Sequence, residues 1–337
     1  MSNIATAIID GVKKAQQEQI TYQKVFESSE NIVAKNEFLF FLKPELTVAD
    51  PKIKFSQIVE LALAKINEFG LKIKNISVLS AQYLQNYNII AQHYGVINQL
   101  SSNPKQYLSE GARAKFQELY GKTVAEANLL GSVEFLTKYP AFNALSLDYL
   151  WQNKANQKLA GGTYCEDIKL DGDLAYVING FHPRQLMHFT DKGRSIVVFT
   201  LAGDLKWSEA RTNLIGTTNP QTAASGSLRK SLLDKKDELG LAEVSQGMNG
   251  VHLSAGAVEG LVELIRYNSN FASKELKTFT DFSFGKSLKS NFSDAQIDSI
   301  LNNENVNVDG KNISIFDLTE EKDSDEAIAI LKNCFKI

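Results

Sequence analysis

The order of the apolar runs limits the folds open to this chain more than any other feature. "EFLFFLKPE" (Glu37–Glu45), a short apolar run stopped by proline, favours a buried strand. In "FSQIVELALAKINEFG" (55–70) the apolar residues recur at helical spacing, and the run ends in glycine. "LKIKNISVLS" (71–80) then alternates like a half-buried strand. Strand, helix and strand in this order predict the first half of a split βαβ unit.

The second half of such a unit comes much later in the chain. "RSIVVFTLAG" (Arg194–Gly203) predicts a strand, and "KWSEARTNLIG" predicts a helix closed by Gly216. "EVSQGMNGVHLS" predicts a strand that leads into the helix "AVEGLVELIRYN". The two halves predict one α+β domain made of residues 36–98 and 177–270.

The remaining segments predict three further parts. Residues 1–35 are expected to form a helical leader, because apolar residues recur at helical spacing up to Ala15. Residues 99–176 contain helical stretches and an Asp-Gly hairpin signal, and they are too many for a structureless loop. We therefore expect an inserted, mainly helical subdomain there. Residues 271–337 predict an α/β extension with a helix capped by Ser293, a second Asp-Gly hairpin and a last helix.

Composition excludes several kinds of partner. The chain has 36 basic and 39 acidic residues, so no global positive field would hold a nucleic acid. Cys165 and Cys334 form neither a C-x-x-C pair nor a disulfide framework, which fits a reducing compartment. No run of about eighteen apolar residues occurs, and the first residues lack the apolar core of a signal peptide. We expect a cytoplasmic protein that binds no nucleic acid and no membrane.

His252 is the main candidate for chemistry. A lone histidine is more often a packed, hydrogen-bonded residue than a catalyst. Asn249 and Ser254 flank this one, and Glu263 follows eleven residues later, in a helix that could fold back beside the strand. A carboxylate held against one imidazole nitrogen fixes the tautomer and leaves the other nitrogen as a nucleophile. The sequence leaves both a structural histidine and a phosphohistidine open.

A second candidate is the loop "GTTNPQTAASGSLRK" (Gly216–Lys230). It supplies hydroxyls, backbone amides and the guanidinium of Arg229, whose planar fork matches phosphate oxygens. A solvated surface loop is the alternative interpretation. For "FLKPE" the alternative is a lysine and proline that only end a strand.

Five pieces occur in a fixed order: "FLKPE", "QHY" (Gln92–Tyr94), "GTTNP", "GSLR" and "NGVHLS". Together they resemble nucleoside diphosphate kinases, whose pattern runs KPD, HY, G-x-TNP, GS-x-R and N-x-x-H-G-S-D. The resemblance covers about 36–98 and 178–268. It implies a ferredoxin-like α/β sandwich with a four-stranded antiparallel sheet, interrupted here by the insertion. It also implies an enzyme that moves the γ-phosphoryl group of a nucleoside triphosphate to a nucleoside diphosphate through a phosphohistidine, with Mg²⁺ carried by the nucleotide.

The resemblance also implies roles for single residues. His252 matches the nucleophile and Glu263 the carboxylate that orients it. The other matches are Lys43 and Tyr94 near the transferred phosphoryl group, Thr218 and Arg229 on the phosphates, Asn249 on the ribose hydroxyl and Ser254 beside the nucleophile. No residue is expected to bind the metal directly. Because the family usually forms hexamers or tetramers, a homo-oligomer is expected.

The chain departs from the family pattern at several positions. Glu45 replaces the aspartate of KPD, and His252–Ala255 lacks the glycine and the aspartate of H-G-S-D. Where a second arginine stands four residues before the glycine of G-x-TNP, this chain has Thr212, with Arg211 one place away. One place in an α-helix turns a side chain by about 100°. Arg229 is therefore expected to be the principal phosphate contact, and Arg211 a weaker one.

Two functions remain open on the sequence. The base-stacking phenylalanine of the family follows the HY helix closely, whereas here the insertion intervenes and Phe181 is the candidate. The first hypothesis is an active kinase, because the nucleophile and its orienting glutamate are both present. The second is a nucleotide-binding or phosphohistidine-carrying regulatory protein with little turnover, which Thr212 and Ala255 favour.

Overall fold

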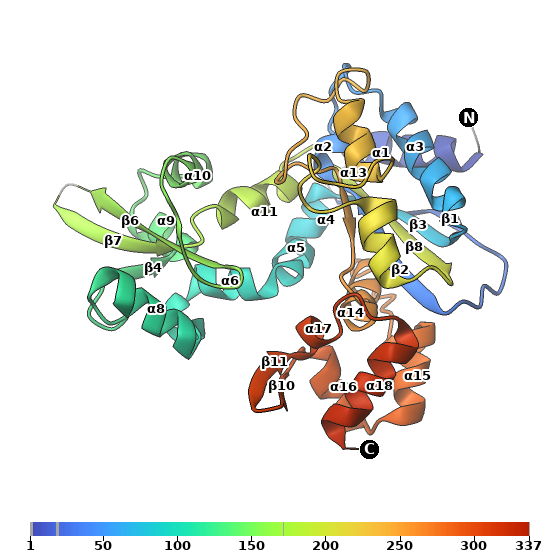
Figure 1. Ribbon diagram of the computed structural model, residues 1–337. Helices are drawn as coiled ribbons and strands as arrows, with labels where there is room; N and C mark the ends of the chain where they lie inside the picture. The colour runs from blue at the N-terminus through green and yellow to red at the C-terminus, as the bar shows by residue number, and fades with distance from the viewer. Residues whose placement is uncertain (1–2, 18–19, 171, 337) are drawn as a thin grey trace. The chain divides into compact units, whose positions relative to one another are not determined.

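The computed structural model describes residues 3–17, 20–170 and 172–336. The chain divides into two compact units, one of residues 1–83 and 192–337 and the other of 84–191. Each unit contains helices and a sheet of its own, so the chain is α+β (Figure 1). Within the described ranges no helix has both the length and the apolar character needed to cross a membrane.

The first unit is built on a five-stranded sheet in the order β1-β3-β8-β2-β9, with every neighbouring pair antiparallel. The strands are β1 (Tyr22–Glu27), β2 (Asn36–Leu42), β3 (Lys72–Ser80), β8 (Ser195–Gly203) and β9 (Val251–Leu253). β2 and β8 are buried along their whole length. Their continuous apolar sequences, rather than alternating ones, are what a strand covered on both faces requires.

The sheet therefore has one strand more than the four expected. The additional strand, β1, lies in the segment predicted as a helical leader, and that prediction is wrong for this part. Helix α1 (Asn3–Gln17) is present, but its helical spacing stops at Ala15. The aromatic and β-branched residues Tyr22, Val25 and Phe26 that follow favour an extended chain, which pairs with β3.

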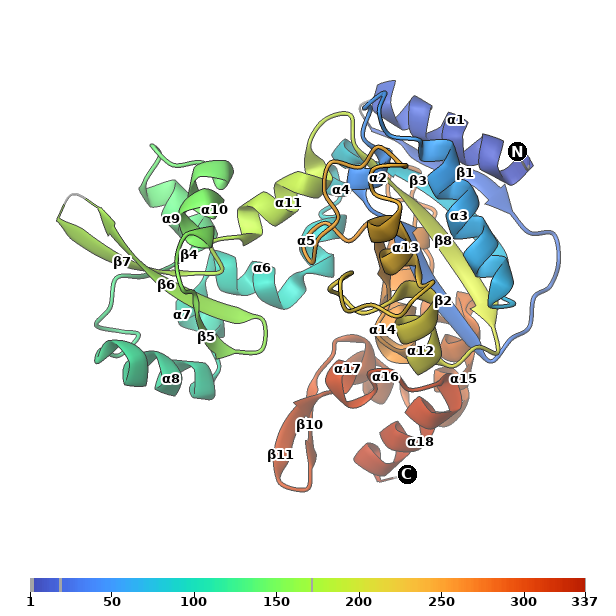
Figure 2. The same cartoon turned by 45° about the horizontal axis from the view of Figure 1, so that its top comes forward.

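Helices cover both faces of this sheet (Figure 2). Helix α1 lies over Val78 of β3, since a Cβ built on Gly11 would be 3.0 Å from Val78 Cγ2. The neighbouring Ser77 points to the opposite face. On that face Tyr22 donates a hydrogen bond to the carbonyl of Asn268, the last residue of α14 (Ala257–Asn268). Helix α3 (Phe55–Glu68) packs beside α1.

Two predicted elements of this unit are shorter or of a different kind. The strand expected over "EVSQGMNGVHLS" is only β9, because the chain makes turns up to Gly250. The helix expected over "KWSEARTNLIG" is a short α12 (Trp207–Glu209) followed by a π-helical turn, η1 (Ala210–Ile215). Two short helices complete the region: α2 (Pro44–Thr47) and α13 (Leu228–Asp234).

The C-terminal part belongs to the first compact unit. It consists of η2 (Phe279–Asp281), α15 (Ser283–Asn291), α16 (Asp294–Leu301), the hairpin β10 (Asn305–Val308) and β11 (Lys311–Ser314), α17 (Ile315–Leu318) and α18 (Ser324–Phe335). Ser293 caps α16 as expected, accepting a hydrogen bond from the N–H of Gln296. Helix α14 packs against several of these helices, so the extension adds a layer behind it.

The second unit combines helices with a four-stranded sheet in the order β4-β7-β6-β5. Its strands are β4 (Leu129–Gly131), β5 (Gln157–Ala160), β6 (Thr163–Leu170) and β7 (Asp173–Ile178). Its helices are α4 (Ala81–Asn86), which begins in the first unit, α5 (Ile89–His93), α6 (Gly95–Ser102), α7 (Pro104–Tyr107), α8 (Glu110–Tyr120), α9 (Ser132–Lys138), α10 (Ala144–Gln152) and α11 (His182–Thr190). The sequence indicates only the β6–β7 hairpin of this sheet, and Asp171 of its turn lies outside the described residues.

The second compact unit runs from 84 to 191, whereas the sequence predicts an insertion at 99–176. The unit therefore extends beyond the predicted insertion at both ends.

Candidate functional site

The segment Asn249–Ser254 brings together most of the site residues expected in the first unit. β9 pairs with the end of β2, and His252 lies opposite Phe41. Before the strand, Gly250 has a φ of 78°, a left-handed conformation that glycine adopts without strain. Its backbone N–H donates to Glu45 Oε1 at 2.8 Å. The tight turn and this hydrogen bond fix where β9 starts, and so fix the position of His252.

Glu263 holds the imidazole of His252 from the following helix. His252 Nε2 lies 3.0 Å from Oε2 and 3.2 Å from Oε1 of Glu263. Ser254 Oγ donates a short hydrogen bond to the same Oε2. The geometry follows from local folding, because α14 starts soon after β9 and runs back along β2. A residue two turns into the helix then returns to the level of the strand.

The surroundings of the pair favour one ring nitrogen as the reactive one. The Glu263 side chain is 3% exposed and that of His252 is 17% exposed. The imidazole stacks on Phe41, with ring centroids 4.5 Å apart and planes at 23°. With Nε2 turned to the carboxylate, Nδ1 is the nitrogen through which this imidazole would act. A buried carboxylate against Nε2 stabilises positive charge on the ring if Nδ1 forms a bond.

Lys43 and Asn249 form the next contact along the segment. Lys43 Nζ donates to Asn249 Oδ1 at 2.8 Å, and Asn249 Nδ2 donates to the carbonyl of Thr218 at 3.2 Å. Burial lowers the pKa of Lys43 from 10.5 to about 8; the carboxylate of Glu45 opposes this shift and the charge of Arg229 adds to it. An anion beside the buried ammonium of Lys43 would stabilise its charged form. The side chain of Thr218 is exposed.

Arg229 joins the loop to β9. Its Nη1 donates to the carbonyl of Gly216 at 2.8 Å and its Nη2 to the carbonyl of Val251 at 3.0 Å. Its Nε is buried, with no hydrogen-bond partner in the part of the chain that the structure describes. Burial, helped by the charge of Arg211, lowers the pKa of Arg229 to about 10. The guanidinium therefore has a structural role and still carries donors for a further acceptor.

The π-helical turn η1 changes the expectation for Arg211. A π-helix bonds residue i to i+5, so it holds one residue more per turn than an α-helix. The rotation of about 100° expected for Arg211 assumes an α-helix, and this assumption is wrong for η1. Arg211 stands five residues before Gly216. In this turn it takes the position that an α-helix would give to the residue four before Gly216. Thr212 turns away, and its Oγ1 donates to the carbonyl of Ser208 at 2.8 Å.

Carboxylates of the C-terminal part hold Arg211. Its Nη2 lies 3.2 Å from Glu320 Oε1 and its Nε lies 3.2 Å from Glu321 Oε1. Close by, burial and the charge of Glu263 raise the pKa of Glu259, while the charge of Arg211 opposes this. Glu259 lies one turn before Glu263 on α14, on the same face.

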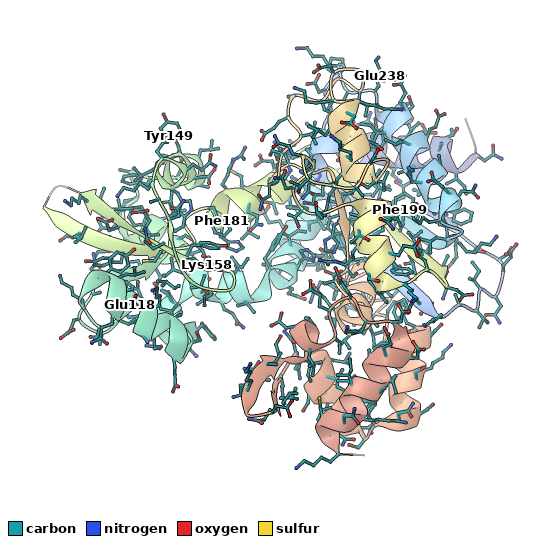
Figure 3. All side chains as sticks on the ribbon, in the orientation of Figure 1. Glu118, Tyr149, Lys158, Phe181, Phe199 and Glu238 are labelled. Carbon is teal, nitrogen blue, oxygen red and sulfur yellow. The ribbon has the colours of Figure 1, made fainter. Side chains whose placement is uncertain are left out.

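Two of the expected site residues belong to the second unit. Tyr94 follows α5, and its ring makes edge contacts with His93, His182 and Phe189. Phe181, labelled in Figure 3, precedes α11 and packs against Trp151, with ring centroids 6.2 Å apart. Within that unit Phe181 is partly buried and packs against a hydrophobic core cluster. Their roles in the site stay predictions.

Three contacts of the site are not expected from the sequence. Phe41 is visible there only as part of an apolar strand, and its stacking on His252 depends on the register of β2 and β9. Glu45 is noted only as a departure from an aspartate, yet it anchors the turn at Gly250. The contact of Arg211 with Glu320 joins residues 109 positions apart, a pairing for which no local pattern exists.

Comparisons with known proteins find likeness only among solved structures. No family model matches the chain, and no curated protein matches it. Among solved structures, the chain is similar to the apo crystal structure, in a cubic form, of nucleoside diphosphate kinase from Encephalitozoon cuniculi. The TM-score is 0.33 and the identity 13%, over 73% of this chain and 96% of that one. No functional statement follows from a likeness at this level.

Proposed function

We propose that the chain is a nucleoside diphosphate kinase-like phosphotransferase with His252 as the phosphoryl carrier. The pairing of His252 with Glu263 is the observation that carries this proposal, because a nearly buried carboxylate aligns one ring nitrogen and would stabilise positive charge on the ring when the other nitrogen forms a bond. The strand order β3-β8-β2-β9, with a helix after β2 and another after β8, supports a ferredoxin-like domain to which β1 is added.

In the proposed reaction, Nδ1 of His252 attacks the γ-phosphorus of a nucleoside triphosphate. The N–P bond forms as the bond to the β–γ bridging oxygen breaks, and the nucleoside diphosphate leaves with that oxygen. Positive charge on the imidazole is stabilised by Glu263, whose second partner, Ser254, keeps the carboxylate in place. A second nucleoside diphosphate then takes the phosphoryl group by the reverse steps, which restores neutral His252.

Cationic side chains around the segment would neutralise the phosphates. Phosphoryl transfer depends mostly on positioning and charge stabilisation, because the transition state is loosely bonded. Lys43 donates to Asn249 and Arg229 to the carbonyl of Val251, so both contact the segment that carries His252. Arg211, whose charge acts on Arg229, is the third cation of the set. We propose that Asn249 and Thr218 contact the nucleotide and that Mg²⁺ enters with its phosphates. Tyr94 and Phe181 are the remaining candidates, at the phosphoryl group and the base.

Isotope exchange tests this function directly. An enzyme that works through a phosphohistidine converts labelled ADP into labelled ATP in the presence of unlabelled ATP, because ADP takes the phosphoryl group back from the phosphoenzyme. We expect this exchange in the wild type and none in His252→Ala. Transfer from ATP to another diphosphate that proceeds without such exchange would mean that no phosphoenzyme lies on the path.

The contacts of Arg229 and Arg211 with the protein favour a second function. Arg229 donates to two backbone carbonyls and Arg211 is held by two glutamates, so both guanidinium groups are engaged by the protein. A site in this state suits a nucleotide-binding or phosphohistidine-carrying regulatory protein with little turnover. The two functions differ in stoichiometry: the regulatory protein would accept one phosphoryl group per chain and pass it on slowly, whereas the enzyme would turn over many times.

A further inference from the structure

The pair Glu320 and Glu321 occupies one whole edge of the Arg211 guanidinium. Nε and Nη2 are the two nitrogens of that edge, and each faces one carboxylate at 3.2 Å. This edge is also one that an arginine uses for bidentate contact with phosphate. Two negative charges against one positive charge leave the local balance negative, which would repel a phosphate.

Arg211 lies near Arg229, one of the cations proposed to bind phosphate. The turn that carries it ends at Gly216, whose carbonyl accepts a hydrogen bond from Arg229. The same turn packs against β9, which carries His252. The charge of Arg211 is near enough to lower the pKa of Arg229. A phosphate bound at Arg229 would therefore interact with Arg211 and with the two glutamates that hold it.

We propose that Glu320 and Glu321 are specificity-determining residues that compete with ligand phosphates for Arg211. This inference takes from the proposed function only that Lys43 and Arg229 bind phosphates. In the unliganded protein the glutamates hold the guanidinium. A ligand with a long, highly charged phosphate chain draws it away, and a ligand with less phosphate charge does not. The pair thus selects triphosphate chains over shorter ones.

The exposure of the three side chains makes this exchange feasible. Arg211 is 29% exposed, Glu320 49% and Glu321 41%. Ion pairs at such positions are weak, because water screens the charges and long side chains lose freedom when they pair. Charge-assisted, bidentate contacts between arginine and phosphate are stronger. A polyphosphate can therefore replace the carboxylates at small cost.

The backbone that carries the glutamates is fixed without their carboxylates. The N–H of Glu321 donates to the carbonyl of Ala255 at 2.8 Å. Asp323 is 2% exposed and accepts hydrogen bonds from the N–H of Trp207 and from Asn36 Nδ2. Neutralising the two glutamates would leave these anchors in place, so a charge effect can be separated from loss of structure.

Calorimetric titration with inorganic tripolyphosphate and pyrophosphate tests the competition. The double variant Glu320→Gln/Glu321→Gln should bind both ligands more tightly than the wild type does. The gain should be larger for pyrophosphate, about tenfold, than for tripolyphosphate, so the preference for the longer chain shrinks. In an Arg211→Ala background the same two changes should give a clearly smaller gain, because they then remove only the repulsion by two exposed charges and release no guanidinium. The matched control is Glu68→Gln, which removes another exposed carboxylate paired with a lysine on α3.

Four results would overturn the inference: unchanged or weaker binding by the double variant, a gain of the same size in the Arg211→Ala background, an unchanged preference for tripolyphosphate over pyrophosphate, or absence of tripolyphosphate binding in every variant. Labelling of His252 by a nucleoside triphosphate is measured separately. If labelling fails while the affinities behave as expected, the kinase proposal is wrong and the competition stands.

Discussion

Glu263 is the residue that holds the imidazole of His252 in place. Its Oε2 receives both His252 and Ser254, and the side chain is almost fully buried. Burial makes its charge more effective, since less water screens it. Its neighbour Glu259 has a raised pKa, caused mainly by burial and then by the charge of Glu263.

Replacing the carboxylate by an amide should slow the phosphorylation of His252. Glu263→Gln keeps the size of the side chain but not the charge that stabilises the imidazolium, so we expect the single-turnover rate to fall by about ten- to a hundredfold. Nucleotide affinity should change little. Ser254→Ala is the matched comparison and should have the smaller effect. Rapid-quench measurement at several concentrations of labelled ATP gives the single-turnover rate and the nucleotide affinity. Equal rates in the wild type and in Glu263→Gln would mean that the carboxylate has only a structural role.

Lys43 should make nucleotide binding depend on pH. Its pKa of about 8 is lowered mainly by burial. A bound phosphate favours the charged ammonium and raises this pKa, so binding above pH 8 takes up a proton and becomes weaker as the pH rises. We expect the Kd for ADP to increase by about tenfold between pH 7 and pH 9, where the phosphates of ADP are already ionised. Lys43→Arg, charged throughout, should abolish this dependence, and an identical pH profile in that variant would contradict the assignment.

At the scale of elements, the π-helical turn η1 sets the position of Arg211 relative to Gly216. Its extra residue places Arg211 in the position that an α-helix would give to Thr212. Such turns behave as single-residue insertions into helices and are frequent at functional sites. Arg211 stands five residues before Gly216 instead of four, and the wider π-helical turn compensates for this extra residue.

Deleting Thr212 tests this account of η1. Without it Arg211 stands four residues before Gly216, and the turn can become α-helical with Arg211 on the same face. We expect tripolyphosphate affinity within about threefold of the wild type for this deletion, and a loss of tenfold or more for Arg211→Ala, as for a charged phosphate contact. A deletion variant that keeps its circular dichroism spectrum but binds as weakly as Arg211→Ala would show that the register argument is wrong.

The sequence predicts those elements whose signals are local. β2, β3, β8, α3 and α14 are read from apolar periodicity and terminators. β9 is shorter than expected because Gly250 and the partner strand β2 set where it starts. η1 is not predicted because no residue pattern distinguishes a π-helical turn from an α-helix. His252 and Glu263 could be paired from their spacing, since strand, turn and helix bring them together. The contact of Arg211 with Glu320 could not, because it depends on tertiary packing.

At the scale of the whole molecule, the second unit is an insertion between two neighbouring points of the first. Ser80 and Ser195 are paired residues of β3 and β8, and the N–H of Ala81 donates to the carbonyl of Arg194 at 2.8 Å. The chain thus leaves and re-enters the first unit at adjacent positions. Each unit also contains one of the two tryptophans, Trp207 in the first and Trp151 in the second.

Replacing residues 84–191 by a short glycine-serine linker should therefore leave a folded first unit. We expect the emission of Trp207, which is fully buried, to stay that of a buried indole and to shift in one cooperative step with urea. If Tyr94 acts on the phosphoryl group as proposed, phosphorylation of His252 should fall by about tenfold or more, because that donor is lost. A shortened protein that is phosphorylated at the full rate would remove Tyr94 and Phe181 from the proposed site.

The central claim is that His252 carries a phosphoryl group, and chemical analysis of the labelled protein tests it most directly. The wild type and His252→Ala are incubated with [γ-³²P]ATP and Mg²⁺, and the bound label is treated with acid and with base. We predict label in the wild type that is lost in acid and retained in base, as for phosphohistidine, and no label in His252→Ala, which should still bind nucleotide. Undiminished label in His252→Ala, or label that is stable in acid and lost in base, would contradict the claim.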